Sequence, residues 1–226
     1  MRLEELSWPE VKEYLKERKD IILPLGSVEE HGYHLPLSTD TDIALAIADG
    51  VSARTGVLVA SPVHYGVCNT TRAYAGTTSV TFDSLRSCLR DIFMSLGDSG
   101  FKAVYVISGH LGSSHVAALK EAARLNSVKV YFLDLRAVDT SDILETKPFH
   151  ACESETSLML YLHPKKVKME KAVDEEIEIR DYRLDALKKT ESGVWGCPTK
   201  ATREKGKRIF EKIAEDFSGF ISSAQG

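Results

Sequence analysis

The sequence predicts an α/β protein, a three-layer α/β/α sandwich with a mostly parallel central sheet. Short apolar runs of strand length alternate with longer segments whose apolar residues recur at helical spacing, and this alternation repeats about four times. The 226 residues, 43% of them hydrophobic, are enough to bury one sizeable core. Neither an internal repeat nor a linker-like stretch interrupts the pattern, so we expect a single domain over residues 1–226.

The first two thirds of the chain carry the regular part of this pattern. We expect helices over residues 7–18, 39–54, 83–96 and 113–125, and strands over residues 20–25, 57–60, 103–107 and 128–133. Ser7 and Pro9 suit the start of the first helix, and Gly56 suits the end of the second. Residues 61–81 have no clear period.

The last third is less regular. We expect a short helix over residues 155–162, a charge-dense and solvated segment over residues 165–181, and an amphipathic helix over residues 202–222. The apolar side of that last helix comprises Ile209, Phe210, Ile213, Phe217, Phe220 and Ile221.

Parallel sheets with right-handed crossovers bind their ligands beyond the carboxyl ends of the strands. The segments that begin at Gly26, Ser61, Ser108 and Asp134 follow the four predicted strands. We therefore expect the functional residues in these segments.

Composition narrows the class of partner. A formal charge of −4 gives no attraction to nucleic acid or to an anionic membrane. No stretch reaches the roughly 18 uninterrupted apolar residues of a membrane helix, and residues 1–19 lack the apolar core of a signal peptide. The four cysteines are far apart and form no C-x-x-C pair, which is typical of reduced thiols in a cytoplasmic protein. A small ligand or a protein partner is the expected one.

The most informative segment is LPLGSVEEHGYHLPLSTDTD, which follows the first predicted strand. In an extended backbone Glu29 and His31 project to the same side, and the chain can fold back so that Asp40 returns to them. Two carboxylates and an imidazole suit Zn, Mn or Fe, and a bridging carboxylate suits a two-metal site. The plainer interpretation is a surface turn, in which Asp42 caps the next helix and Glu30 is solvated.

A histidine ends the third predicted strand, in the segment SGHLGSSH. Gly109 and Gly112 flank His110 and allow it to approach the loop of Glu29 closely. The alternative is a strand-end histidine bonded only to backbone. His115 is expected on the following helix, away from the ligand side.

The segment FHACESETSLML precedes and enters the short helix of the last third. His150 is a candidate proton donor, and Glu155 is a candidate carboxylate that ligates or orients a ligand. From these residues alone an ordinary acidic helix start, capped by Ser154, is the favoured interpretation. The hydroxyls of YAGTTS, residues 74–79, are candidates for a pocket lining.

Taken together, these segments resemble the creatininase (creatinine amidohydrolase) family over nearly the whole chain. The segment after the first strand is similar to the family signature GS-x-E-x-HG-x-HLP...TD. Four further matches follow in the family's order: GTTS at residues 76–79, SGH at 108–110, H-x4-ETS at 150–157 and the SREKG-like TREKG at 202–206.

The resemblance implies a three-layer α/β/α fold and a binuclear metal amidohydrolase, often a hexamer. By matching positions the metal ligands are Glu29, His31, Asp40 and His110, with Asp40 as the bridging carboxylate. His150 matches the family's catalytic histidine. We therefore expect two divalent ions per chain (Zn, Mn or Fe), a homo-oligomer, and a small-molecule amide as substrate.

Two departures from the family pattern bear on the site. Creatininase carries a further ligating glutamate two residues after the histidine that matches His110, and Gly112 stands there in this chain. Glu155 or water then replaces that ligand, or the second metal site is weak. Lys147, Pro148 and Phe149 replace the aromatic residues that sandwich creatinine, which argues against creatinine itself as the substrate.

The expected reaction is hydrolysis of a small, possibly cyclic, non-peptide amide by metal-activated water, with His150 and Glu155 as catalytic residues. One alternative is a formamide hydrolase that acts on a formylaminopyrimidine nucleotide in flavin or deazaflavin synthesis. Others are a relative that trims a peptide in cofactor maturation and a metallophosphatase with Arg72 and Arg136 as phosphate ligands. An alternative of another class is a binding or assembly module that keeps the fold without catalysis.

Overall fold

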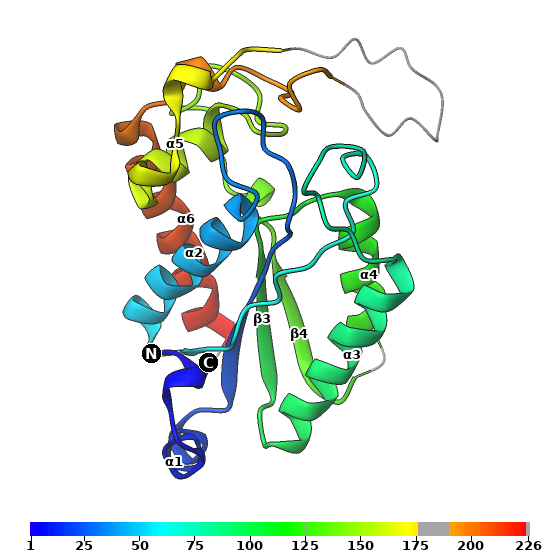
Figure 1. Ribbon diagram of the computed structural model, residues 1–226. Helices are drawn as coiled ribbons and strands as arrows, with labels where there is room; N and C mark the ends of the chain where they lie inside the picture. The colour runs from blue at the N-terminus through cyan, green and yellow to red at the C-terminus, as the bar shows by residue number, and fades with distance from the viewer. Residues whose placement is uncertain (125, 176–189, 225–226) are drawn as a thin grey trace.

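A computed structural model of the protein describes residues 1–124, 126–175 and 190–224. Its centre is a sheet of four parallel strands in the order β2-β1-β3-β4 (Figure 1). The strands are β1 (Asp20–Leu25), β2 (Leu58–Val59), β3 (Ala103–Ser108) and β4 (Lys129–Leu133). β1 and β3 pair over their whole lengths, so their carboxyl ends are level and the loops that follow them meet.

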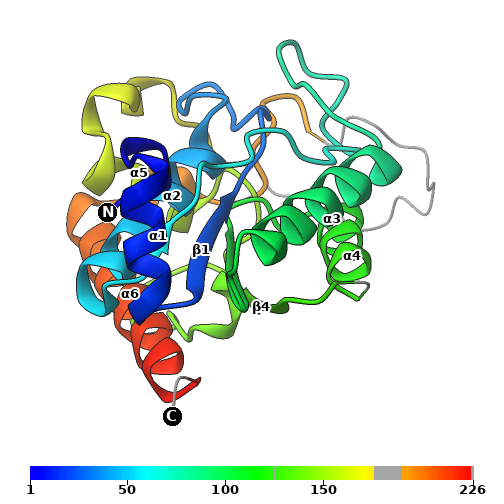
Figure 2. The ribbon, with the colours of Figure 1, turned by 90° about the horizontal axis from the view of Figure 1, so that it is seen from below.

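Helices cover both faces of the sheet (Figures 1 and 2). One face packs against α2 (Thr39–Thr55), α5 (Glu153–Leu162) and α6 (Arg203–Ala224). The other packs against α3 (Phe82–Asp98) and α4 (Ser113–Ala123), with α1 (Trp8–Glu17) contributing at one side. Short 3-10 helices lie at Leu3–Glu5, Leu135–Ala137, Pro164–Lys166, Met169–Lys171 and Pro198–Lys200. The predicted α/β/α sandwich with a parallel sheet is confirmed.

The sequence of β1 explains why the fold has two apolar layers. Successive side chains of a strand point to opposite faces of the sheet. Ile22 accordingly packs with α2, α5 and α6, whereas Ile21 and Leu23 pack with α3 and α4. Every residue of β1 is buried, which is the pattern of a central parallel strand covered on both sides.

Each predicted helix and strand is present, with ends that differ by at most two residues. Two predicted inward side chains are not fully buried, and of these Phe210 is partly buried against the core. Phe220 is 41% exposed, because it packs edge-on against Tyr131 of the edge strand β4 rather than under a neighbouring element. Ile209, Ile213 and Phe217 of the same helix are buried as predicted.

The irregular segments also agree with the sequence. Residues 61–81 contain isolated bridges, from Val63 to Leu25 and from Thr78 to Val28, and otherwise turns. Residues 165–175 are largely exposed, as predicted, and residues 176–181 of that charged segment lie outside the described residues. Among the helices that the structure describes, none is both long enough and apolar enough to cross a bilayer.

A glycine sets the closest approach between α5 and α6. A Cβ atom on Gly206 would lie 1.8 Å from the carbonyl oxygen of Ser157 and 2.4 Å from its carbon. Both atoms are α5 backbone and cannot move aside as a flexible side chain would. The two helices therefore pack backbone to backbone at this point, next to the first turn of α5, which carries functional side chains.

We predict that Gly206→Ala destabilises the protein by about 1–3 kcal/mol, because the new methyl forces α5 and α6 apart. The matched control is Gly219→Ala on the same helix, where a Cβ meets nothing within 4 Å. Replacing an exposed helical glycine there stabilises by about 0.5–1 kcal/mol. Urea unfolding followed by circular dichroism measures both variants, and equal stability of Gly206→Ala and wild type would contradict the packing argument.

Candidate metal and catalytic site

The six predicted site residues meet at the carboxyl edge of the sheet. Glu29 and His31 lie in the loop after β1, and Asp40 lies in the first turn of α2. His110 directly follows β3, and His150 and Glu155 flank the start of α5. The sheet edge thus gathers side chains that are up to 126 positions apart in the sequence.

Asp40 stands at the centre of this group. Its Oδ1 lies 3.1 Å from Nε2 of His31, and its Oδ2 lies 3.2 Å from Nδ1 of His110. Ser27 donates its hydroxyl to Oδ2 over 2.6 Å. The carboxylate is 2% exposed and spans the gap between the two imidazoles, which is the position that a bridging carboxylate needs.

Both imidazoles are held by the nitrogen that faces away from Asp40. Nδ1 of His31 lies 3.1 Å from the carbonyl oxygen of Glu29, and Nε2 of His110 lies 3.0 Å from that of Val67. A carbonyl only accepts hydrogen bonds, so in the neutral tautomers these nitrogens carry the proton. The nitrogens beside Asp40 then present lone pairs, as metal-ligating histidines do.

Most of the possible ligand atoms fall into two halves on either side of the central carboxylate, and a third group, which comprises Glu29, His31 and His150, connects them. One half comprises His31, Asp40 and Glu155, and the other comprises Glu29, Cys68 and His110, with the ligand atoms of each group within 4.8 Å of one another. Oε2 of Glu29 and Nε2 of His31 are buried without a hydrogen bond. Buried polar atoms left without hydrogen bonds and aimed at each other fit a site for divalent cations.

The pKa values of the cluster in the absence of ions also indicate a site for positive charge. Burial by itself lowers the pKa of His31, but the carboxylates of Asp40, Glu155 and Glu29 outweigh it and raise that pKa to about 10. Burial opposes ionisation of Asp40, yet His31 and His110 hold the pKa of its carboxyl well below the ordinary value. The cluster therefore binds positive charge, either as protons on the imidazoles or as cations in their place.

His150 is oriented by the carboxylate of Glu30, a residue that the sequence predicts to be solvated. Nε2 of His150 lies 3.0 Å from Oε1 of Glu30 and 2.9 Å from the Glu30 carbonyl oxygen. Glu30 is 5% exposed, and its Oε2 also accepts the N–H of Gly32. The prediction of a solvated Glu30 is wrong, because the loop turns at Gly32, which has a positive φ of 66°, and folds the carboxylate inward.

Several other predictions receive a structural answer. Asp42 lies in the first turn of α2 and accepts hydrogen bonds from Ser38 and Lys166 outside the site, but Ser38 and not Asp42 is the N-cap residue. Cys152, not Ser154, occupies the N-cap of α5, and Glu155 closes a capping box with it while also facing His31.

His115 belongs to none of the possible ligand groups, in agreement with the sequence prediction, although it is close to one of them. It lies on α4 as expected but is fully buried against the ring of His110, with ring centroids 4.7 Å apart. Its Nδ1 accepts the N–H of Val67 over 3.3 Å. Burial lowers the pKa of His115 to about 3, so it packs behind His110 as a neutral ring.

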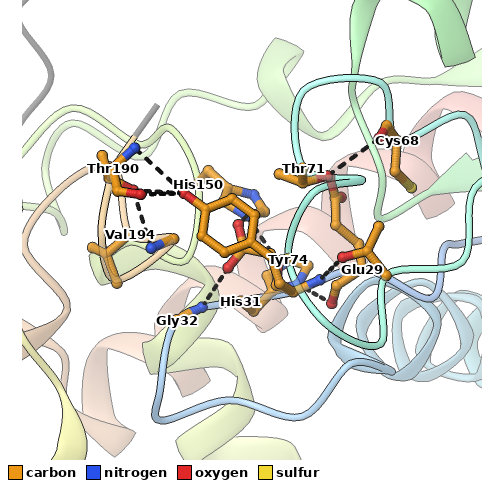
Figure 3. A network of polar contacts seen from close by, with 12 residues as sticks. Glu29, His31, Gly32, Cys68, Thr71, Tyr74, His150, Thr190 and Val194 are labelled. Atoms are coloured by element: carbon orange, nitrogen blue, oxygen red, sulfur yellow. Dashed lines mark hydrogen bonds and ion pairs between the residues drawn. The ribbon is translucent and has the colours of Figure 1, made fainter. Parts of the chain in front are cut away.

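Three contributors to the site carry no signal in their local sequence. Cys68 and Thr71 come from the irregular loop after β2, and the Thr71 hydroxyl donates to Oε1 of Glu29 (Figure 3). Trp195 stacks on Phe149 with ring centroids 5.0 Å apart and lies 5.8 Å from the ring of His150. An aromatic wall therefore stands beside His150, although one of its members follows His150 by 45 positions.

The YAGTTS hydroxyls brace loops instead of lining a pocket. Thr77 accepts the N–H of Glu30 over 2.9 Å, and the Tyr74 hydroxyl donates to the carbonyl oxygen of Thr190 over 2.5 Å (Figure 3). These bonds hold the loop after β1 against the loop after β2 and join the latter to the segment that carries Trp195.

A cavity of about 860 Å³ opens beside the cluster. Glu29, Asp40, His110, His150 and Glu155 line its floor, and Lys147, Phe149, Trp195 and Arg136 belong to its walls. Arg136 is engaged by Asp134 over 2.6 Å, and Arg72 is not part of the lining. The space exceeds what a single small ring requires.

This fold and site define a class of enzyme. The family model for creatininase, described as creatinine amidohydrolase, matches residues 4–221. The chain belongs to the creatininase family and is a hydrolase that acts on C–N bonds.

Relatives within the family differ in what their names say they act on. The mycofactocin precursor peptide peptidase of Mycobacterium ulcerans is 32% identical over 211 residues, which cover 87% of this chain and 82% of that protein. The creatinine amidohydrolase of Pseudomonas putida is 27% identical over 245 residues, which cover 96% of this chain and 94% of that protein. A solved creatininase superimposes with a TM-score of 0.90 at 24% identity, covering 99% of this chain and 97% of that chain.

We predict that His34 makes the protein sensitive to acid. Burial, and secondarily the charge of His31, lower its pKa to about 4 against about 6.5 in an unfolded chain. Between pH 6.5 and 4, His34 is therefore protonated in the unfolded state and neutral in the folded state. Stability that is present above pH 6.5 is lost as the pH falls towards 4. Between pH 7 and 4.5 the free energy of unfolding of the metal-free wild type should fall. In metal-free His34→Asn this fall should be smaller by about 2 kcal/mol.

Urea unfolding at a series of pH values measures this difference. Asn retains a group that can bond the Thr156 hydroxyl, which lies 2.8 Å from Nε2 of His34. Parallel pH profiles of the two proteins below pH 6.5 would show that His34 is protonated in the folded state.

Proposed function

We propose that this protein is a metal-dependent amidohydrolase that uses two divalent cations per chain to cleave the C–N bond of a small amide. One observation carries the proposal. Asp40 lies between two imidazoles, each of which turns one nitrogen to Asp40 and gives the other to a backbone carbonyl. A merely structural histidine has no need of this arrangement.

The donors of the two halves suit Zn, Mn or Fe. Solved creatininases of the same fold carry titles that name a Zn–Zn form and a Mn form. Glu29, His31, Asp40, His110 and Glu155 would hold the ions, with Asp40 shared. Bound there, such ions would polarise the amide carbonyl and lower the pKa of a water molecule towards about 7.

Glu155 takes the place of the glutamate ligand that creatininase has at the position of Gly112. A Cβ on residue 112 would lie 2.8 Å from Nε2 of His110, so a larger side chain is excluded unless that ring moves. Glu155 offers its carboxylate beside His31 and Asp40 instead. The half that contains His31 thus has three protein donors without a carboxylate at position 112.

His150 is the proposed proton donor to the leaving nitrogen. Glu30 accepts from Nε2 and fixes the tautomer, which leaves Nδ1 for proton transfer. Among the described residues Nδ1 has no hydrogen-bond partner, and the ring lines the cavity. Such acid catalysis contributes about 10²- to 10⁴-fold in rate.

The cavity bears on the substrate. A small, possibly cyclic, amide fits against the pair formed by Phe149 and Trp195, and a creatininase variant has been solved with creatine. A formamide nucleotide would need a cation for its phosphate. Arg136 of the cavity wall is engaged by Asp134, so Lys147, which also lines the cavity, is the candidate for that contact. Homo-oligomer formation and a cytoplasmic location stay predictions from the sequence.

A second candidate substrate is the amide of a peptide. The size of the cavity, about 860 Å³, favours it, because a single small ring leaves much of that space empty. The relatives named as peptide peptidases, at 32–33% identity, favour it as well. Turnover of creatinine, formamides, cyclic amides and short peptides by one preparation separates the two candidates.

We predict that Asp40→Ala abolishes binding of both ions and that His31→Ala abolishes at least one, because the first removes the shared ligand. Elemental analysis of the folded, dialysed proteins measures the stoichiometry. His64→Ala, at an exposed position outside the cluster, is the control and should keep the wild-type metal content. Unchanged stoichiometry in both site variants would remove the metal site from the proposal.

We predict that His150→Ala retains its metal and loses about 10²- to 10⁴-fold in kcat, since the residue supplies a proton rather than a ligand. Metal content and steady-state kinetics on the same sample test both parts. Full activity of His150→Ala would exclude His150 from the mechanism, and loss of metal would assign it to the ligands.

A further inference from the structure

A buried cysteine lies against one half of the site. Cys68 is 1% exposed, and its thiol belongs to a group with Glu29 and His110 whose ligand atoms all lie within 4.8 Å of one another. Apart from Cys68, the described cysteines belong to no such group. Cys152 is also buried, but it caps α5, and its sulfur lies 3.8 Å from Oε2 of Glu155.

The loop of Cys68 is fixed to the same carboxylate and the same imidazole. The Cys68 N–H donates to the Ser79 hydroxyl over 2.9 Å. Thr71 contacts both the Cys68 carbonyl oxygen and Glu29 (Figure 3). The preceding residue, Val67, accepts the hydrogen bond that orients His110. The thiol is therefore held beside Glu29 and His110 by the backbone on either side of it.

An independent observation marks this half as incomplete. Oε2 of Glu29, on a side chain that is 2% exposed, has no hydrogen bond and faces Nδ1 of His110 over 2.7 Å. The buried carboxylate and the ring thus face each other as an ion pair, and Oε2 has no further hydrogen-bond partner among the described residues. Nothing except a cation or a proton offsets the charge of a carboxylate placed there.

We propose that Sγ of Cys68 is a protein ligand of the ion held by Glu29 and His110, so that one half of the site contains sulfur and the other only oxygen and nitrogen. The inference rests on the proposed function and adds a ligand to it. Two ligands of a tetrahedral zinc ion stand roughly 3.3–3.8 Å apart, given Zn–S near 2.3 Å and Zn–N or Zn–O near 2.0–2.2 Å. Oε2 of Glu29 and Nδ1 of His110, which lie 2.7 Å apart, would have to move apart to admit the ion, and the three ligand atoms already lie within 4.8 Å of one another.

The consequence is a difference in metal preference between the halves. Thiolate is a soft ligand that favours Zn over Mn, whereas the carboxylates and imidazole of His31, Asp40 and Glu155 accept either. The half with Cys68 should therefore retain Zn when Mn is in excess. The Cys68→Ser variant should lose this preference, with a fall in Zn affinity of at least about 10- to 100-fold, the loss that follows removal of a residue that only orients a ligand.

Cobalt spectroscopy of the whole chain tests the ligand directly. Co²⁺ occupies zinc sites, and a thiolate bound to it gives a ligand-to-metal charge-transfer band in the near ultraviolet. Metal-free protein is titrated with Co²⁺ for wild type, Cys68→Ser, Cys68→Ala and Cys152→Ser. We expect the band in wild type and Cys152→Ser and its absence in both Cys68 variants. Elemental analysis of each sample records how much cobalt is bound.

The outcomes are distinct. Cobalt bound by wild type without the band overturns the cysteine ligand and leaves the proposed function standing. A band that persists in Cys68→Ser, or that disappears in Cys152→Ser alone, assigns the sulfur elsewhere and overturns it too. Failure of wild type to bind cobalt, zinc or manganese overturns both proposals. Because the wild-type spectrum alone can refute the inference, it does not depend on the variants being folded.

Discussion

One buried carboxylate organises the functional end of this protein. Asp40 lies between His31 and His110, and each of its oxygens faces a different ring. A charge removed from water at this depth requires a compensating charge. Both rings bond a backbone carbonyl with their other nitrogen, so in the neutral tautomers the nitrogen beside Asp40 presents a lone pair to a cation.

The fold makes room for this carboxylate by pressing α2 against the ends of two strands. A Cβ on Gly109 would lie 2.1 Å from the carbonyl oxygen of Asp40, and one on Gly26 would lie 2.6 Å from the Cα of Thr41. Both glycines directly follow strands, β3 and β1, that end at the same level. The backbone contact of α2 with the sheet edge therefore depends on two positions without side chains.

The environment of His150 is assembled from two distant segments and a sharp bend in its own. Glu30 orients the ring, Trp195 stands beside it, and the residue after it, Ala151, has a positive φ of 49°. That conformation is uncommon for a residue other than glycine and turns the chain between His150 and the cap of α5. The ring thus reaches the site from a short, sharply bent connection and not from the helix itself.

The sequence by itself determined the layers, the sheet edge at which the site forms, and six of its residues. Strand and helix periods are local properties, and the spacing of Glu29 and His31 places both on one side of an extended loop. Only the tertiary structure decided the roles of Glu30, Cys68 and Trp195, since each depends on a partner from a remote segment. Local spacing carries no record of such contacts, because they arise when level parallel strands bring separate loops to one edge.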